Sequence, residues 1–204
     1  MTIVFASHNK DKIEEMRRIF SDAAKDHEIT VLGAGDVGVG DVEETGTTFE
    51  ENALIKARAV ADAGYIAIAD DSGLCVDALG GEPGVFSKRW SGGTPAENNQ
   101  MMLEKLKDVP TEKRGAHFVS VIACVLPDGS EPIIAEGKCS GIIAEESRGN
   151  GGFGYDPVFL IPSLGKTFAE LTPEEKNEIS HRGKAMRELQ KRLPEIIERA
   201  KALR

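Results

Sequence analysis

Residues 117–126, HFVSVIACVL, constrain the fold of this chain more than any other stretch. Only His117 and Ser120 interrupt an otherwise apolar run, and such a run is typical of a strand that is buried on both faces of a sheet. The PDG sequence at 127–129 then predicts a turn into a returning strand at 132–144. We therefore expect a hairpin within a largely buried sheet.

Strands and helices alternate before this hairpin. Further strands are predicted from apolar character at residues 2–7, 28–34, 65–70 and 157–162. Helices are predicted from apolar spacing and capping boxes at residues 10–22, 48–63 and 95–108, and from the N-cap Thr172 onward. This order predicts an α/β fold with a mixed sheet, in a single domain that spans residues 1–204.

The charge and the cysteines exclude several classes of function. The chain has 204 residues and a formal net charge of -9, so it lacks the basic surface that a nucleic acid polymer needs. The apolar stretch at residues 2–7 is too short for a signal peptide or a membrane span. Cys75, Cys124 and Cys139 have no metal-ligand or redox spacing, which favours reduced thiols. We therefore expect a soluble cytoplasmic protein that does not bind membranes.

The SHNKDK stretch at residues 7–12 lies between a predicted strand and a predicted helix. Lys10 and Lys12 fall in the first helical turn, where the helix dipole disfavours cations. A bound anion would reverse this effect. The alternative is an ordinary turn in which Asn9 caps the helix and both lysines are solvated, and this stretch alone slightly favours the alternative.

Two adjacent acids, Asp70 and Asp71, follow the predicted strand at 65–70. Side chains alternate along a strand, so only one of them can point into a given site. That carboxylate and Glu44 would suit Mg²⁺, which takes one or two protein carboxylates together with phosphate oxygens. The alternative for the two acids is an ordinary acidic turn at DSG. Lys56 lies at the edge of the apolar stripe of the helix predicted at 48–63. The alternative for this lysine is a side chain that extends into water.

A glycine-rich loop and a polar helix provide a further candidate site. Glycines in GNGGFGYD allow close backbone approach, and Phe153 and Tyr155 offer flat rings to a planar ligand. The predicted final helix carries Lys176, His181 and Arg182. The alternatives are a plain turn and a solvated helix face. Taken together, the candidate stretches supply what a nucleotide site needs: phosphate donors, metal ligands, a stacking ring and base-edge donors.

Five motifs occur in order along the chain: SHNKDK, EETG with TFEENALIKA, AIADDSG, GGFGYDP and SHRG. By these motifs the chain resembles, from end to end, the inosine triphosphate pyrophosphatase family, whose members act on non-standard purine nucleoside triphosphates. The resemblance implies an elongated mixed sheet flanked by helices, in two lobes with the active-site cleft between them. It also implies Mg²⁺ as cofactor and a homodimer.

The resemblance further implies a role for each matching residue. Asp71 and Lys56 would be catalytic, with Asp71 as proton acceptor, and Glu44 and Asp71 would hold Mg²⁺. The triphosphate would be bound by side chains and backbone amides of Ser7, His8, Asn9, Lys10, Asp11 and Lys12. The remaining substrate contacts would come from Ser72, Phe153, Gly154, Tyr155, Asp156, Lys176, His181 and Arg182.

The implied reaction converts ITP, dITP or XTP and water to the monophosphate and pyrophosphate. Water attacks the α-phosphorus while the metal, Lys12 and Lys56 neutralise charge on the phosphate oxygens. An aspartate with a pKa of about 3.9 is a weak base, so the metal is expected to do most of the activation, with Asp70 facing away. The alternatives are a Maf-like pyrophosphatase for pyrimidine or modified nucleotides, a non-catalytic nucleotide sensor and a scaffold protein.

Overall fold

A mixed sheet organises the described part of the chain, which in this computed structural model comprises residues 1–23 and 29–203. Its strand order is β2-β1-β3-β4-β5-β6-β7. Both β2 and β3 pair with β1 in parallel, whereas β6 pairs antiparallel with β5 and β7. The strands are β1 (Thr2–Phe5), β2 (Thr30–Gly33), β3 (Ile66–Val76), β4 (Gly115–Val125), β5 (Ile133–Ile143), β6 (Phe159–Ile161) and β7 (Lys166–Thr167). The predicted mixed α/β sheet is confirmed; Glu28, in the predicted strand at 28–34, lies outside the described residues.

The chain divides into two compact units that both draw on β3, β4 and β5. The first unit comprises Met1–Asp71, Ser120–Gly137 and Lys184–Arg204, and the second comprises Ser72–Val119 and Lys138–Gly183. No helix in the described ranges is long and apolar enough to cross a membrane.

Most helices begin where the sequence predicts. Thr48 caps α2 and Thr172 caps α4, each within a capping box. The helices are α1 (Lys10–Ala23), α2 (Phe49–Ala61), α3 (Pro95–Leu106), α4 (Pro173–Ile179), α5 (His181–Lys191) and α6 (Leu193–Ala202).

The single final helix that the sequence predicts is instead three helices. The backbone of Ser180 is extended, with φ -67° and ψ 156°, and its hydroxyl accepts a hydrogen bond from the amide of Gly183 at 3.0 Å. A Cβ at Gly183 would overlap the backbone oxygen of Asn177. The break at Ser180 therefore brings two helices into contact through a glycine, and a second break at Arg192 separates α5 from α6.

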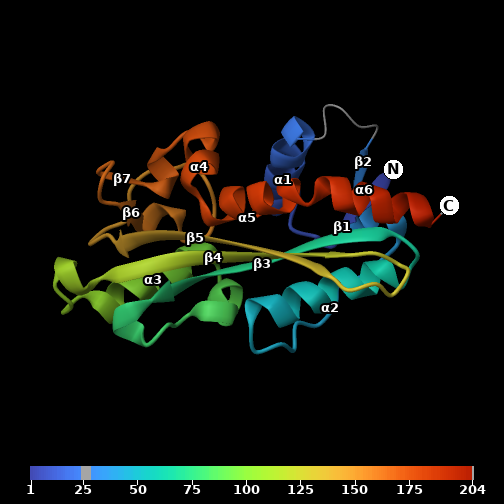
Figure 1. Ribbon diagram of the computed structural model, residues 1–204. Helices are drawn as coiled ribbons and strands as arrows, with labels where there is room; N and C mark the ends of the chain where they lie inside the picture. Colours follow the sequence, from blue (N-terminus) through green and yellow to red (C-terminus); the bar gives the residue numbers. More distant parts are fainter. Residues whose placement is uncertain (24–28, 204) are drawn as a thin grey trace. The chain divides into compact units, whose positions relative to one another are not determined.

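Alternate residues of the first unit's strands pack on opposite faces of the sheet. Ile3 and Ile68 belong to a cluster completed by Met186 of α5. Val4 belongs to another cluster, completed by Ala57 of α2. Figure 1 shows α2 on one side of β1 and β3, and α5 and α6 on the other.

Strand β3 continues past the two acids to Val76, so the predicted strand end at Asp70 is wrong, and so is the alternative of an acidic turn at DSG. Leu74 and Val76 are fully buried in the core of the second unit, which explains the extension. Asp70 and Asp71 consequently lie within a strand and are buried, with 8% and 5% exposure. Buried carboxylates need partners.

The second unit has its own core around Phe118, Phe159 and Phe168. The rings of Phe118 and Phe159 meet edge to face with centroids 4.7 Å apart, and Phe159 meets Phe168 in the same way at 4.8 Å. This geometry suits the quadrupoles of aromatic rings. The cluster fixes the surroundings of α4 and the start of α5.

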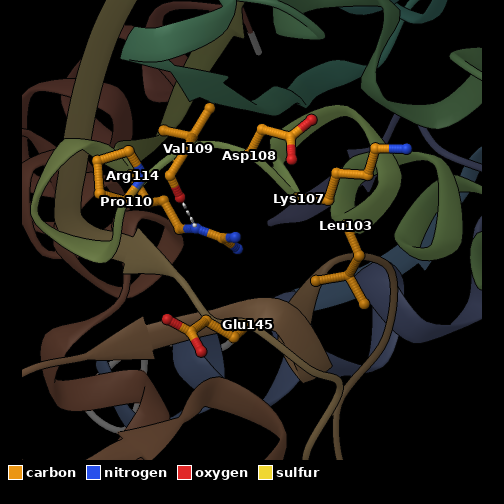
Figure 2. Close-up of a pocket in the computed structure, with 7 residues that line it drawn as sticks. All are labelled: Leu103, Lys107, Asp108, Val109, Pro110, Arg114 and Glu145. Atoms are coloured by element: carbon orange, nitrogen blue, oxygen red, sulfur yellow. Dashed lines mark hydrogen bonds between the residues drawn. The ribbon is translucent and has the colours of Figure 1, made fainter.

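The buried side chain of Arg114 bonds to the last residue of α3 and lies beside a cavity of about 490 Å³. Figure 2 shows the guanidinium of Arg114 among the lining side chains, with Nε donating to the carbonyl oxygen of Val109 at 2.8 Å. The other two nitrogens donate to the carbonyls of Leu106 and Ala144. The lining residues are Leu103, Lys107, Asp108, Val109, Pro110, Arg114 and Glu145. None of them is a predicted site residue.

Arg114→Met is expected to lower the free energy of unfolding by about 3 kcal/mol or more, because it removes the hydrogen bonds that the buried guanidinium donates to three carbonyl oxygens. Urea or guanidinium unfolding would measure this loss. Lys107→Met is the matched control, since Lys107 lines the same cavity with an exposed side chain and should change stability by less than about 0.5 kcal/mol. Equal losses in the two variants would contradict the structural role of Arg114.

Candidate active site

The start of α1 is a capped turn, as one alternative for SHNKDK predicts. The amide of Lys12 donates to Oδ1 of Asn9 at 3.1 Å, and the amide of Asn9 donates to Oγ of Ser7 at 3.2 Å. Lys10 and Asp11 are exposed, and Nε2 of His8 lies 3.6 Å from Oδ1 of Asp41. The capping alternative is therefore correct for Asn9 and Lys10.

Lys12 is not a solvated lysine. Its Nζ lies 3.0 Å from Oδ2 of Asp70, and Oδ1 of Asp70 accepts a hydrogen bond from the hydroxyl of Ser120. Strand alternation does send Asp70 to the face opposite Asp71, as predicted. However, this places Asp70 against Lys12, which is a predicted phosphate ligand. This contact of Asp70 was not predicted.

Lys56 connects the two predicted metal ligands. Its Nζ donates to Oε1 of Glu44 at 2.9 Å, to Oδ1 of Asp71 at 3.1 Å and to the carbonyl oxygen of Asp70 at 2.8 Å. The side chain of Lys56 is only 13% exposed, so the alternative in which it reaches water is wrong. Burial lowers the pKa of Lys56, but attraction to Asp71 and Glu44 outweighs burial and raises it, so the ammonium is charged at neutral pH.

Of the two carboxylate oxygens of Asp71, one accepts a hydrogen bond and the other does not. Oδ1 accepts from Lys56, whereas Oδ2 is buried and has no hydrogen-bond partner. Burial raises the pKa of Asp71, and attraction to Lys56 and Lys12 offsets this only in part. The expectation of an ordinary aspartate pKa is therefore wrong, and Asp71 is a stronger base than a solvated aspartate.

The carboxylate oxygens that surround Lys56 are suitable ligands for a hard metal cation. Glu44 and Asp71 converge on one ammonium group, and the free Oδ2 of Asp71 provides an oxygen that lacks a partner. Within the described ranges, no group of three or more His, Cys, Asp or Glu side chains is arranged around a metal position. An ion that takes one or two protein carboxylates and completes its shell with phosphate and water oxygens suits this arrangement.

A second cluster, in the second unit, surrounds Asp156. Oδ2 of Asp156 accepts from Nζ of Lys176 at 2.7 Å and from the amide of Phe153 at 2.9 Å. Gly152 has φ +67°, and a Cβ there would overlap the Asp156 carboxylate. The glycine is thus required for the close approach that the sequence predicts.

Phe153 lies beneath two cations. Nζ of Lys176 is 4.6 Å from its ring centroid, and Cζ of Arg182 is 5.4 Å from it. Arg182 also donates to Oγ of Ser72 at 3.0 Å. His181 stacks on Phe118, with centroids 4.6 Å apart. Because Lys176, His181 and Arg182 are all buried, the solvated-face alternative is wrong.

Tyr155 does not offer its ring to a ligand. The ring is 5% exposed and belongs to the second unit's core, and its hydroxyl donates to the carbonyl oxygen of Ser87 at 2.7 Å. Phe153, the other ring of this loop, is half-buried. Gly154 accepts a hydrogen bond from the side chain of Asn99 at 3.0 Å, which anchors the loop to α3.

Comparison with known proteins matches residues 3–192 to the family model described as the Ham1 family. The chain belongs to the Ham1 family. A relative in Frankia alni named dITP/XTP pyrophosphatase is 50% identical over 97% of this chain and 99% of its own length. One in Streptomyces coelicolor with the same name is 48% identical, covering 92% and 94%. The solved structure of a HAM1 protein from Coxiella burnetii has a TM-score of 0.86 at 46% identity, covering 96% and 99%.

Residues beyond the motifs also shape the site of this Ham1 chain. Ser120 holds Asp70 and is one of the two polar residues in the apolar run at 117–126. A buried hydroxyl needs a hydrogen-bond partner. The position of Ser120 in a buried strand could therefore have indicated that it bonds another side chain of the site. Asn99 gave no such signal, because an asparagine in a helix usually faces solvent.

Proposed function

We propose that this Ham1-family chain is a nucleoside triphosphate pyrophosphatase. It hydrolyses ITP, dITP and XTP to the monophosphate and pyrophosphate, and so removes non-standard purine nucleotides from the nucleotide pool. The observation that carries the proposal is the contact of Lys56 with both Glu44 and Asp71. The names and identities of the relatives in Frankia and Streptomyces support it.

In this proposal the first unit binds the triphosphate. Lys12 and Lys56 are cations with low exposure, 20% and 13%, so their attraction to phosphate oxygens is weakly screened. Both ammonium groups now bond to carboxylates. We propose that each exchanges a carboxylate contact for a phosphate oxygen when substrate binds. Asn9 and Ser7 would hold the turn that presents the first amides of α1 to the phosphates.

The metal in this proposal is Mg²⁺, held by Glu44 and Asp71. When bound, the metal would neutralise negative charge on the phosphate oxygens. Asp71 would accept the proton of the attacking water. Asp70, through Lys12, would position the triphosphate without touching the water.

The second unit in this proposal binds the base and the sugar. Lys176, Arg182 and, through a ring N–H, His181 are donors that suit the 6-carbonyl of hypoxanthine and xanthine. Phe153 would stack on the purine ring. The backbone around Gly154, Tyr155 and Asp156 would line the pocket, and Ser72, which Arg182 now contacts, would touch the substrate.

We further propose that residues 1–204 act as one domain, since both units draw on β3, β4 and β5 and neither is a continuous segment. Cys75, Cys124 and Cys139 are free thiols, which suits the cytoplasm where nucleoside triphosphates occur. A homodimer is proposed from the family resemblance.

Purified protein incubated with a nucleotide panel tests the function through its products. We expect ITP, dITP and XTP to yield monophosphate and pyrophosphate, because the site grips a whole triphosphate and leaves pyrophosphate as a stabilised leaving group. Ion-exchange chromatography without added pyrophosphatase separates the products. Release of orthophosphate and a diphosphate would contradict the proposal. A preference for pyrimidine triphosphates would favour the Maf-like alternative, and binding without turnover would favour a sensor.

A further inference from the structure

The loop that carries Glu44 is fastened to the helix that carries Lys56. The backbone amide of Gly46 donates to Oδ1 of Asn52 at 2.8 Å. Asn52 belongs to the first turns of α2 and is fully buried. It precedes Lys56 by four residues, so the two side chains share a face of the helix. One side chain on α2 thus holds the loop, and another contacts the loop's carboxylate.

Gly46 fits against Asn52 with no room to spare. A Cβ at Gly46 would lie 2.6 Å from Oδ1 of Asn52 and 2.7 Å from Cβ of Glu51. Glu51 also fixes the next residue, because its carboxylate accepts from the amide and the hydroxyl of Thr47 at 2.6 and 3.0 Å. The loop is therefore held two residues after Glu44, close to the backbone that carries the Glu44 carboxylate.

The buried amide of Asn52 is costly to the fold. Its Nδ2 is buried and has no hydrogen-bond partner, and an unpaired buried donor is destabilising. A leucine of similar size would avoid that cost but would lose the acceptor for Gly46. The contact with the loop is thus the function that this side chain performs in the structure.

We propose that Asn52 is a positioning residue that holds the Glu44 loop against Lys56 and thereby sets the metal affinity of the site. This inference rests on the proposed function, because it takes Glu44 and Asp71 as the metal ligands. Residues that orient a metal ligand commonly change metal affinity by about 10- to 100-fold when replaced.

A matched control exists in the second unit. Asn98 occupies the same place in α3 as Asn52 does in α2, directly after the glutamate of the capping box. It is also buried, and its Oδ1 accepts from the amide of Ser91 in the preceding loop at 2.8 Å. That loop carries no proposed metal ligand. Asn98→Leu therefore breaks the corresponding helix-to-loop contact away from Glu44, together with the bonds that Nδ2 of Asn98 donates to the carbonyl oxygens of Ser87 and Lys88.

The test is direct titration of nucleotide-free protein with Mn²⁺, followed by electron paramagnetic resonance, with Mn²⁺ as a probe for the divalent site. We expect Asn52→Leu to weaken Mn²⁺ binding by about 10- to 100-fold and Asn98→Leu to leave it unchanged. Gly46→Ala breaks the same contact from the loop side and should reproduce the loss even if Asn52→Leu does not fold. In turnover assays, excess metal should restore kcat in Asn52→Leu.

The outcomes separate the inference from the proposed function. Wild-type Mn²⁺ affinity in folded Asn52→Leu or in Gly46→Ala would overturn the positioning role alone. An equal loss in Asn98→Leu would also overturn it, since the effect would then be a general loss of structure. A wild-type chain that binds no Mn²⁺ would overturn the metal site together with the inference, while the product analysis would still decide the pyrophosphatase activity.

Discussion

Asp71→Asn is expected to lower kcat by about 10³-fold or more, with the fold intact. The substitution removes the proposed proton acceptor and a proposed metal ligand in one step, whereas an amide preserves the size of the side chain. The oxygen that bonds Lys56 can be retained, so we expect little change in the unfolding transition. Steady-state kinetics with ITP, circular dichroism and Mn²⁺ titration would measure the three effects.

Asp70→Asn is the matched comparison, because the two acids are adjacent and both are buried. Asp70 contacts Lys12 and Ser120, so its loss should act on the position of Lys12 and raise KM more than it lowers kcat. Mn²⁺ affinity should fall in Asp71→Asn only. If both variants were equally stable, kept their metal affinity and lost kcat equally, the assignment of Asp71 would be wrong.

ITP and XTP are expected to exceed ATP in kcat/KM by about 10⁴-fold, the order that sites which hydrogen-bond a substrate group achieve. The 6-carbonyl of their bases is an acceptor, whereas adenine has a donor amino group there. Lys176 and Arg182 are donors without acceptor capacity, so adenine would face them with no bond to form. Rejection of GTP has to come from its 2-amino group, either by steric exclusion near the loop of Phe153 and Gly154 or because that donor is left unpaired, and we expect it to be substantial.

Arg182→Ala and Lys176→Ala should lower kcat/KM for ITP far more than for ATP. The ITP to ATP ratio is the quantity to measure, because both substrates are assayed on one sample and a loss of folded protein cancels. This matters for Lys176, because its removal takes one cation away from the buried carboxylate of Asp156 and is expected to destabilise the fold. Lys166→Ala, an exposed residue of β7, is the control and should leave the ratio unchanged. A wild-type chain that hydrolyses ATP or GTP as well as ITP would indicate a general triphosphate pyrophosphatase.

The fold was predictable where local chemistry decides it. Thr48 and Thr172 predict the starts of α2 and α4, because an N-cap and its capping box act within one helical turn. The extension of β3 to Val76 was not predictable, because two adjacent acids resemble a turn unless their lysine partners are known. The break at Ser180 depends on the close approach of Gly183 to Asn177, which is a tertiary contact.

In the candidate site, too, the residues within local motifs were predictable, whereas the tertiary contacts were not. The motifs identified Glu44, Lys56 and Asp71, and the structure brings these three together. The pairing of Lys12 with Asp70 could not be read from sequence, because it depends on how α1 lies against a strand far along the chain. Alternation predicted the opposite faces of the two acids, but it says nothing about what covers each face. The buried state of Tyr155 was likewise set by its partner, Ser87.

The first unit is assembled from three separate segments of the chain. Its sheet residues Ile3 and Ile68 share a core with Met186 of α5 and Ile196 of α6. A ribosome therefore delivers the strands of this unit well before the helices that cover one of their faces. During synthesis the part of that apolar face that α5 and α6 cover stays exposed until these helices emerge. A premature stop before α5 is therefore expected to release an aggregation-prone product rather than a smaller enzyme.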